Sequence, residues 1–306
     1  MELRHLRYFL AVAEEGQFTR AAERLAMQQP PLSQQIRLFE EEMGFELFVR
    51  NPRGVTLTPA GAALADEARV LLEGIQGAVG RARRIARGEM GTLSVGLTSS
   101  ASFHPLTTDI IRVFRAALPD VGVELEELNA AELIERLANA QVHVGFMRKP
   151  VDPREGIVYQ RIVDESMVVV LPIGHPLLKH QRAAKPKIRL EALAQEEFIL
   201  VRRPGAPGMY ADFLAACRLA GFTPRIAVEV PRMLSAINAV AAGLGVTLVP
   251  ASMVRYHCDN AVYCPLAQPE LLGAPLNLAY ATTLNNSTAQ RFIKFATERA
   301  AALGTD

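Results

Sequence analysis

The sequence has few cysteines, no tryptophan and no excess of charge of either sign. Three Cys in 306 residues are too few for a disulfide scaffold. The 33 Lys and Arg residues are balanced by 32 Asp and Glu, so the chain lacks the basic excess of a typical nucleic-acid-binding protein. No apolar run approaches the ~18 residues that span a bilayer, and residues 1–10 are too charged for a signal peptide. We therefore expect a soluble, cytoplasmic protein that does not associate with a membrane.

Motifs for catalysis, nucleotide binding and metal binding are also missing. The chain contains no Gly-x-Ser-x-Gly, Walker, His-Glu-x-x-His or kinase signature. His257, Cys258 and Cys264 are close in sequence but lack a fourth ligand and Cys-x-x-Cys spacing, so no metal site is expected. The prediction is a protein without a cofactor that is not an enzyme. The alternative left open is a cytoplasmic small-molecule-binding protein or an enzyme on a two-lobed scaffold.

Apolar residues, in contrast, are plentiful. Half of the residues are hydrophobic, which excludes an intrinsically disordered chain and is ample for real cores. At ~100 to 200 residues per domain, a chain of this length is expected to form two domains. The first 58 residues have a net charge of −1, from 7 Arg and 8 Glu. Any affinity of this segment for DNA must therefore come from a few well-placed arginines, with a shallow dependence on salt.

Residues 1–58 have the pattern of a helix-turn-helix domain. Apolar residues at helical spacing run from Leu3 to Ala13, and Gly16 is placed to end that helix. A second short helix is expected over 18–25, where an Ala-Ala pair permits the close approach of another helix. The Pro30-Pro31 pair fits only the first turn of a helix, so a third helix begins there.

The third helix and the two short strands after it carry the candidate DNA contacts. Leu32, Ile36 and Phe39 are spaced to face the core, which leaves Gln, Ser and Arg side chains outside, the types that read base edges. Strands expected over 47–50 and 55–58 form a wing whose arginines reach phosphate or the minor groove. An ordinary solvated surface is the alternative. The predicted DNA-binding residues are Gln29, Pro30, Pro31, Ser33, Gln34, Arg37, Arg50, Arg53 and Thr56.

A long linker helix is expected over 59–88, with Thr58 as its N-cap and Pro59 in its first turn. A helix of about 29 residues spans ~43 Å, which a 58-residue domain cannot cover. Its apolar residues alternate in steps of four and three, as in a coiled-coil seam. The seam predicts a homodimer through this helix, and packing on the C-terminal domain is the alternative. The seam consists of Leu64, Ala68, Leu71, Ile75, Ala78, Ala82 and Ile85.

From residue 89 to 306 strands and helices alternate, which predicts parallel sheets joined by right-handed crossovers. Strands are expected over 92–97, 121–125, 142–146 and 166–171 in a first cluster and over 198–201, 225–229, 246–249 and 276–280 in a second, so we expect two lobes around a cleft. Ligands of such sheets bind beyond the carboxyl ends of strands. At these ends the chain offers the hydroxyls of 98–102, Arg148, and the pair Arg202 and Arg203, which suit a carboxylate. Helix capping by the hydroxyls and surface positions for the arginines are the alternatives.

Four segments together resemble LysR-type transcriptional regulators: Met1–Phe9, Phe18–Leu25, Gln29–Ile36 and Leu47–Gly61. Within that family the opening and the Gln-Pro-Pro-Leu-Ser segment are most similar to the muconate-responsive activators of aromatic catabolism. The resemblance implies an α/β protein overall, with an N-terminal winged helix-turn-helix domain that is mostly α, a long linker helix, and a C-terminal two-lobed effector domain of the periplasmic-binding-protein type. Lobe I would comprise about 89–163 and 266–306, and lobe II about 164–265.

The resemblance also implies a ligand and partners. Ser99 matches a serine that holds an effector carboxylate, and Asn129 stands beside Ala130, where the family has a threonine. The implied partners are operator DNA, a small carboxylate-bearing effector from aromatic metabolism, and further copies of the chain in a homodimer and homotetramer, with RNA polymerase as a candidate. The predicted effector-binding residues are Ser99, Ser100, Asn129, Arg148, Arg202 and Arg203.

The sequence departs from the family at four places. Gln17 and Gln28 stand where serine commonly caps a helix, which costs ~1 kcal/mol at each site. Gln34 stands where arginine is frequent on the reading helix, and Ala130 lacks the hydroxyl expected for muconate. These departures concern individual contacts and leave the groove geometry unchanged.

Overall fold

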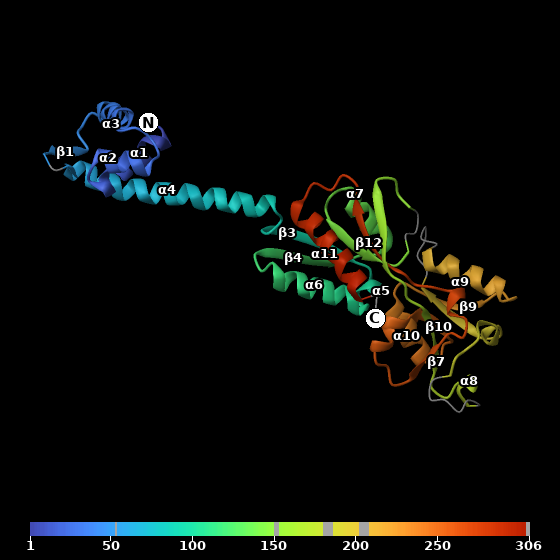
Figure 1. Cartoon of the computed structure of the whole chain (residues 1–306). Coiled ribbons are helices and arrows are strands. Elements are labelled where there is room, and N and C mark those ends of the chain that lie inside the picture. The colour runs from blue at the N-terminus through green and yellow to red at the C-terminus, as the bar shows by residue number, and fades with distance from the viewer. Residues whose placement is uncertain (53, 150–152, 180–185, 202–207, 304–306) are drawn as a thin grey trace. The chain divides into compact units, whose positions relative to one another are not determined.

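The computed structural model describes residues 1–52, 54–149, 153–179, 186–201 and 208–303. Contacts between residues divide the chain into two compact units, Met1–Arg84 and Ile85–Asp306 (Figure 1). In the part of the chain that is described, no helix is long and apolar enough to cross a membrane.

The first unit consists of three short helices, a two-stranded wing and most of a long helix. The third helix begins at Gln29 with the two prolines in its first turn, and Gly16 and Gly44 end the first and third helices with φ of 66° and 77°. Gln17 and Gln28 are N-caps whose side chains make no capping hydrogen bond, as their departure from serine predicts. The elements are α1 (Leu3–Glu15), α2 (Phe18–Arg24), α3 (Gln29–Met43), β1 (Phe48–Asn51), β2 (Gly54–Leu57) and α4 (Pro59–Ala86).

An aromatic cluster holds these elements together. The ring of Phe9 in α1 lies 6.3 Å from that of Phe39 in α3 and 5.4 Å from that of Phe48 in β1, measured between ring centroids. Ala21 and Ala22 of α2 are buried between the helices, as expected for a close crossing. The outer face of α3 is therefore fixed relative to the wing.

The turn of the wing is attached to the end of α1. The N–H of Val55 donates to the carbonyl of Gly16 at 2.8 Å. Gly54 has a φ of 145°, and a Cβ at this position would lie 2.3 Å from the same carbonyl oxygen. Only glycine fits here, so the wing position depends on this residue.

Helix α4 has two environments along its length. Thr58 Oγ1 accepts from the N–H of Gly61 at 2.9 Å, which confirms the predicted N-cap. Ala68, a member of the predicted seam, is fully buried in the core of its own unit, so the seam available to a second chain begins only at Leu71, which is 54% exposed. The first turns of α4 complete the small domain, and the remaining turns extend beyond it.

The second unit contains a five-stranded sheet in the order β4-β3-β5-β12-β6, which we call lobe I. Helices α6 and α11 pack on one face around Phe114 and Phe292, and α7 packs on the other around Leu133. The elements of lobe I are β3 (Gly91–Leu97), α5 (Ser99–Ser102), α6 (Pro105–Ala117), β4 (Val121–Glu127), α7 (Ala130–Ala138), β5 (Val144–Met147), β6 (Ile157–Val163), β12 (Leu276–Ala281) and α11 (Ser287–Leu303).

Lobe II is built on two smaller sheets, β10-β7-β11 and β8-β9. Alternate residues of β7 belong to two cores: Val169 faces the core that includes α9, and Val168 faces the core that includes α10. The elements are β7 (Met167–Pro172), α8 (Pro176–Lys179), η1 (Leu190–Leu193), β8 (Glu197–Val201), α9 (Gly208–Leu219), β9 (Arg225–Val230), α10 (Met233–Ala241), β10 (Thr247–Pro250), η2 (Ala251–Arg255), β11 (Ala261–Pro265) and η3 (Pro269–Leu271).

The prediction of parallel sheets is correct for β3, β4 and β5 and for β8 and β9, and wrong for the other strand pairs of the second unit. Strands β3, β4 and β5 are parallel, but β12 runs antiparallel to β5 and β6, and β7 runs antiparallel to β10 and β11. The chain leaves lobe I through β6 and returns through β12, and it enters lobe II through β7 and leaves through β11 (Figure 1). Strands that leave and strands that return must point in opposite directions. The sequence patterns also did not identify β6 and β11 as strands.

Candidate functional site

The outer face of α3 carries the side chains predicted to read DNA. Leu32, Ile36 and Phe39 are fully buried, as expected, and turn the opposite face of the helix to solvent. Gln29, Ser33 and Arg37 line a surface depression together with Arg50 of the wing. Three turns of one helix and one strand of the wing thus present amide, hydroxyl and guanidinium groups to the same space.

Arg50 is held from two sides. Its guanidinium lies 5.8 Å from the centre of the Phe18 ring and 3.8 Å from the Glu40 carboxylate. That carboxylate also accepts from the N–H groups of Leu47 and Phe48, at 2.8 and 3.1 Å. Glu40 therefore connects α3 to the start of the wing and orients an arginine that still exposes 44% of its side chain.

The other predicted DNA contacts lie outside this depression. Pro30 and Pro31 are exposed in the first turn of α3, and Gln34 is exposed beside the depression without lining it. Thr56 is exposed on β2, where its hydroxyl accepts from the Asn51 amide at 3.5 Å. Arg53 lies outside the described residues.

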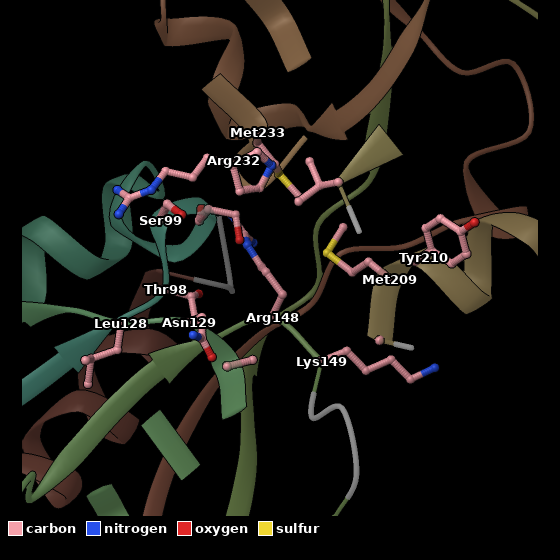
Figure 2. A pocket seen from close by; sticks show the side chains of 15 residues that line it. Thr98, Ser99, Leu128, Asn129, Arg148, Lys149, Met209, Tyr210, Arg232 and Met233 are labelled. Atoms are coloured by element: carbon pink, nitrogen blue, oxygen red, sulfur yellow. The ribbon is translucent and has the colours of Figure 1, made fainter. Parts of the chain in front are cut away.

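Lobe I and lobe II enclose a cleft of about 130 Å³ (Figure 2). It lies beyond the carboxyl ends of β3, β4 and β5, as expected for such a sheet. The described residues that line it include three cations and no carboxylate. Its polar lining residues are Thr98, Ser99, Ser100, Asn129, Arg148, Lys149 and Arg232. Its larger apolar and aromatic lining residues are Leu128, Val201, Met209, Tyr210, Pro231 and Met233.

Arg148 is buried at the base of this cleft, with 3% of the residue exposed, so a surface position is excluded. It donates to the Glu165 carboxylate, to the carbonyls of Ser100 and Ala274 at 2.9 Å, and to Ser252 Oγ at 3.1 Å. Its Nε–H has no hydrogen-bond partner among the described residues. Burial lowers the pKa of Arg148, and the Glu165 carboxylate opposes that shift. Arg148 thus forms a buried ion pair with Glu165 beside the cleft.

Some of the hydroxyls after β3 contact backbone carbonyls and are not available to a ligand. Ser102 Oγ donates to the carbonyl of Ser99 at 2.7 Å, and Thr98 Oγ1 lies 3.5 Å from the carbonyl of Phe146. Ser99 and Ser100 remain in the cleft lining. Asn129 lines the cleft while capping α7, because its Oδ1 accepts from the N–H of Glu132 at 2.9 Å. Asn129 therefore caps a helix and lines the cleft at the same time.

Two ion pairs join the lobes beside the cleft. Lys149 Nζ lies 2.6 Å from Asp212 Oδ1 in α9, and Arg232 Nη1 lies 2.6 Å from Glu127 Oε1 at the end of β4. In Figure 2 Lys149 and Arg232 extend away from each other, toward opposite sides of the view. Each pair connects a residue of lobe I to a residue of lobe II, so the length of both ion pairs depends on the distance between the lobes.

His104 lies close to the Arg148–Glu165 pair. Its Nδ1 accepts from the N–H of Leu106 at 3.1 Å, which caps α6, and its Nε2 lies 3.7 Å from the Glu165 carboxylate. Burial lowers the pKa of His104, the Glu165 carboxylate opposes the shift, and Arg148 and Arg255 add to it. A neutral ring that accepts one hydrogen bond fits these surroundings.

Some predicted features cannot be placed in the cleft. Arg202 and Arg203 lie outside the described residues.

Within the ranges that the structure describes, no group of three or more His, Cys, Asp or Glu side chains could hold a metal ion.

Comparison with known proteins identifies both units. Residues 3–62 match the model of the bacterial regulatory helix-turn-helix proteins of the LysR family, and residues 86–301 match the LysR substrate binding domain. The chain belongs to the LysR family. The resemblance inferred from the sequence is confirmed, as is the fold class of an α/β protein with an N-terminal helix-turn-helix domain and a C-terminal effector domain.

Relatives in the LysR family extend over nearly the whole chain. The transcriptional regulator YnfL of Escherichia coli is 39% identical over 270 residues, which cover 88% of this chain and 89% of YnfL. The transcriptional regulator AlsR of Bacillus subtilis is 37% identical over 293 residues, 96% of this chain and 94% of AlsR. These relatives are named as regulators and not as enzymes, in agreement with the prediction.

Solved structures of the LysR family share the architecture. The crystal structure of CbnR aligns with a TM-score of 0.81 at 29% identity, covering 97% of this chain and 100% of CbnR. Full-length CbnR in complex with its target DNA aligns with a TM-score of 0.78 at 28% identity, covering 98% and 100%. The chain is therefore a LysR-family DNA-binding transcriptional regulator with an effector-binding domain.

Several residues of both sites were missed in the sequence. Thr19 and Asn51 join the depression at α3, and Lys149, Arg232 and Met233 line the cleft. Arg232 lies between a strand and a helix, as residues 98–102 do. The same sequence signal could therefore have identified Arg232 as a candidate. No sequence signal brought Met209 or Tyr210 to the cleft, because α9 reaches it only through the packing of lobe II.

Proposed function

We propose that this regulator binds operator DNA as a dimer and responds to a small anionic metabolite in the cleft between its lobes. Gln29, Ser33 and Arg37 would contact bases, and Arg50 would contact phosphate or the minor groove. The observation that supports this reading is the shared depression, which brings these four side chains from α3 and the wing together. The other proposed DNA contacts are Pro30, Pro31, Gln34, Arg53 and Thr56.

The exposed turns of α4 are the proposed dimer contact. Leu71 and Ile85 of the seam are 54% and 52% exposed in the single chain, and apolar side chains repeated at seam spacing favour a second helix. Pairing of dimers through the effector units into a tetramer would let an effector change the bending of the operator. RNA polymerase is a further proposed partner, and the proposed place of action is the cytoplasm, where the operator DNA lies.

The proposed effector carries a carboxylate, as acids of aromatic metabolism do. The cleft lining supports this proposal, since it includes three cations, two serines and an asparagine but no acidic side chain among the described residues. Ser99, Ser100, Asn129 and Arg148 are the proposed binding residues, together with Arg202 and Arg203 from the sequence pattern.

Two measurements test this function. A gel-shift assay with the intergenic DNA upstream of the gene should show specific binding, and absence of binding at low salt would rule out the regulator function for this DNA. A thermal-shift screen of aromatic-pathway acids should identify a stabilising ligand whose effect is lost in Ser99→Ala. Equal shifts in the variant and the wild type would place the effector elsewhere.

A further inference from the structure

The cleft described above adjoins a second, apolar cavity inside lobe II. This cavity, of about 40 Å³, shares Val201, Met209, Tyr210 and Met233 with the cleft. Beyond these shared residues it is lined mainly by buried apolar side chains of lobe II. They are Met167, Leu200, Phe213, Leu248 and Leu272, and we call this cavity the tail compartment.

Polar groups in the tail compartment are scarce and occupied. Thr247 is buried, and its hydroxyl donates to the carbonyl of Ile199 at 2.6 Å. No charged side chain among the described residues lines the compartment. A carboxylate placed there would lose its hydration without gaining a partner, at a cost that excludes it. The compartment therefore accepts apolar groups only.

The cleft has the opposite character at its other end. Ser99, Asn129 and Arg148 lie together on one side of it, whereas the sulfur-bearing side chains of Met209 and Met233 lie toward the tail compartment (Figure 2). Arg148 supplies a buried guanidinium with one N–H left without a partner among the described residues. Methionine side chains are flexible and polarizable, so they adapt to an apolar chain that passes between them.

We propose that the effector is a monocarboxylate with an apolar tail, bound with its head near Ser99, Asn129 and Arg148 and its tail in the tail compartment. This inference rests on the proposed function of the cleft and specifies the class of ligand. A short acid without a tail leaves the compartment unfilled, and a dicarboxylate of the same length places its second charge among apolar side chains. Both should bind more weakly than a tailed monocarboxylate.

The size of the compartment limits the tail. Transfer of one methylene group out of water contributes enough to tighten binding about fourfold. The compartment measures only about 40 Å³, so it accommodates a short tail and not a long one. Affinity should therefore rise over a few added carbons and then stop rising.

Calorimetric titration of the full-length protein tests this inference. The ligands are straight-chain carboxylates from acetate to octanoate, the dicarboxylates of matching length, and the matching alcohols, which carry a tail without the charged head. Wild type should show a stepwise increase in affinity with chain length for the monocarboxylates alone, and Ser99→Ala should weaken all of them.

Variants locate the tail. Val201→Phe places a bulky ring where the cleft and the tail compartment meet and should abolish the dependence on chain length. Val230→Phe is the matched control, because Val230 pairs with Val201 across β8 and β9 but lines neither cavity. Met209→Ala, at the start of α9, shortens a partly buried side chain that lines both cavities and should shift the plateau to a longer tail, which covers the case in which Val201→Phe does not fold.

The outcomes separate this inference from the proposed function. Affinity that is independent of chain length but lost in Ser99→Ala would overturn the tail compartment and leave the anionic effector site standing. Tighter binding of dicarboxylates than of monocarboxylates, or equal loss of length dependence in Val201→Phe and Val230→Phe, would also overturn it. Absence of saturable binding by every carboxylate tested would overturn the tailed monocarboxylate, whereas the anionic effector itself would be refuted only if the screen of aromatic-pathway acids also found no ligand.

Discussion

Lys149 Nζ lies 2.6 and 2.8 Å from the two carboxylate oxygens of Asp212, and this ion pair joins lobe I to lobe II at the edge of the cleft. Both side chains are partly exposed, at 47% and 34%, so the pair contributes about 1 kcal/mol or less to stability. The ion pair also affects ligand binding. Asp212 binds the Lys149 ammonium group, which lines the cleft and would otherwise be available to an anionic effector.

Removal of Asp212 should therefore strengthen the binding of an anionic effector. In Asp212→Asn, Lys149 is released toward the cleft, and we expect a few-fold tighter affinity at low ionic strength, from an interaction of roughly 1 kcal/mol. The measurement is calorimetric titration with an effector identified in the screen. Asp164→Asn is the matched control, since Asp164 pairs with Arg161 and does not line the cleft. Equal affinities in wild type and Asp212→Asn would contradict this role of the ion pair.

The reading face of α3 makes a prediction about sequence discrimination. Gln29→Ala and Ser33→Ala should each weaken specific binding by ~1–3 kcal/mol at the contacted base, because a base-edge hydrogen bond is lost. Fluorescence anisotropy with wild-type and base-substituted operators measures this loss. Arg4→Ala on α1, outside the depression, serves as the control. Unchanged discrimination in both α3 variants would show that another face of the helix reads the DNA.

Arg50 should affect the salt dependence of DNA binding and not its sequence preference. The residue is held beside Phe18 and Glu40 and faces the same depression as α3. Loss of one phosphate contact in Arg50→Ala should reduce the slope of log affinity against log salt by about 1. Titrations at several salt concentrations test this. A slope identical to that of wild type would mean that Arg50 makes no phosphate contact.

The exposed seam of α4 predicts a dimer that a single charge disrupts. Leu71→Glu places a charge among apolar seam residues and should shift the protein toward monomer in sedimentation velocity experiments. Val70→Glu is the control, because Val70 is 66% exposed but lies outside the seam. Identical oligomeric states of Leu71→Glu and wild type would favour the alternative that this face of α4 packs elsewhere.

His104 predicts a loss of stability in mild acid. Its pKa is lowered in the folded protein, chiefly by burial, so the unfolded chain binds more protons just below the ordinary value of about 6.5. The stabilisation by the neutral ring is therefore fully present above that value and is lost as the pH falls through the lowered pKa. Chemical unfolding of the full chain from pH 8 to pH 5 measures it.

Replacement of His104 separates its titration from the rest. His104→Asn keeps a side chain that can cap α6 and removes the titrating ring, so its stability should decrease less between pH 7 and pH 5 than that of wild type. Some decrease should remain, because burial also lowers the pKa of His143, whose Nδ1 accepts from the N–H of Ser94 at 2.9 Å. Parallel pH profiles of variant and wild type would exclude His104 as the source.

Much of the first unit could be predicted from local sequence signals. Gly16 determines where α1 ends, the prolines at 30 and 31 determine where α3 begins, and the spacing of Leu32, Ile36 and Phe39 determines which face α3 exposes. These signals act within one or two helical turns, so they need no knowledge of distant residues. The seam of α4 was harder, because whether Ala68 is available to a partner depends on what covers it in its own unit.

The second unit shows where this local reasoning ends. The strands that alternate with helices were predicted, but β6 and β11 were not. The antiparallel direction of β12 was also not predicted, because it depends on how the chain passes from one lobe to the other and back. The same limit applies to Arg148. Its position at a strand end could be recognised in the sequence, but its burial depends on pairing with Glu165, which lies 17 positions further along the chain.

By itself, then, the sequence determined the helix-turn-helix domain, the reading face and the positions of strand ends, since periodicity, capping and proline act locally. The balance of 33 basic against 32 acidic residues concealed this, because it averages over surfaces of different character. Only the tertiary structure decided that the described lining of the cleft has cations but no carboxylate, and that Met209 and Val201 line both the cleft and an apolar compartment. The first feature comes from contacts between the lobes and the second from packing within lobe II, and both depend on how the whole chain packs.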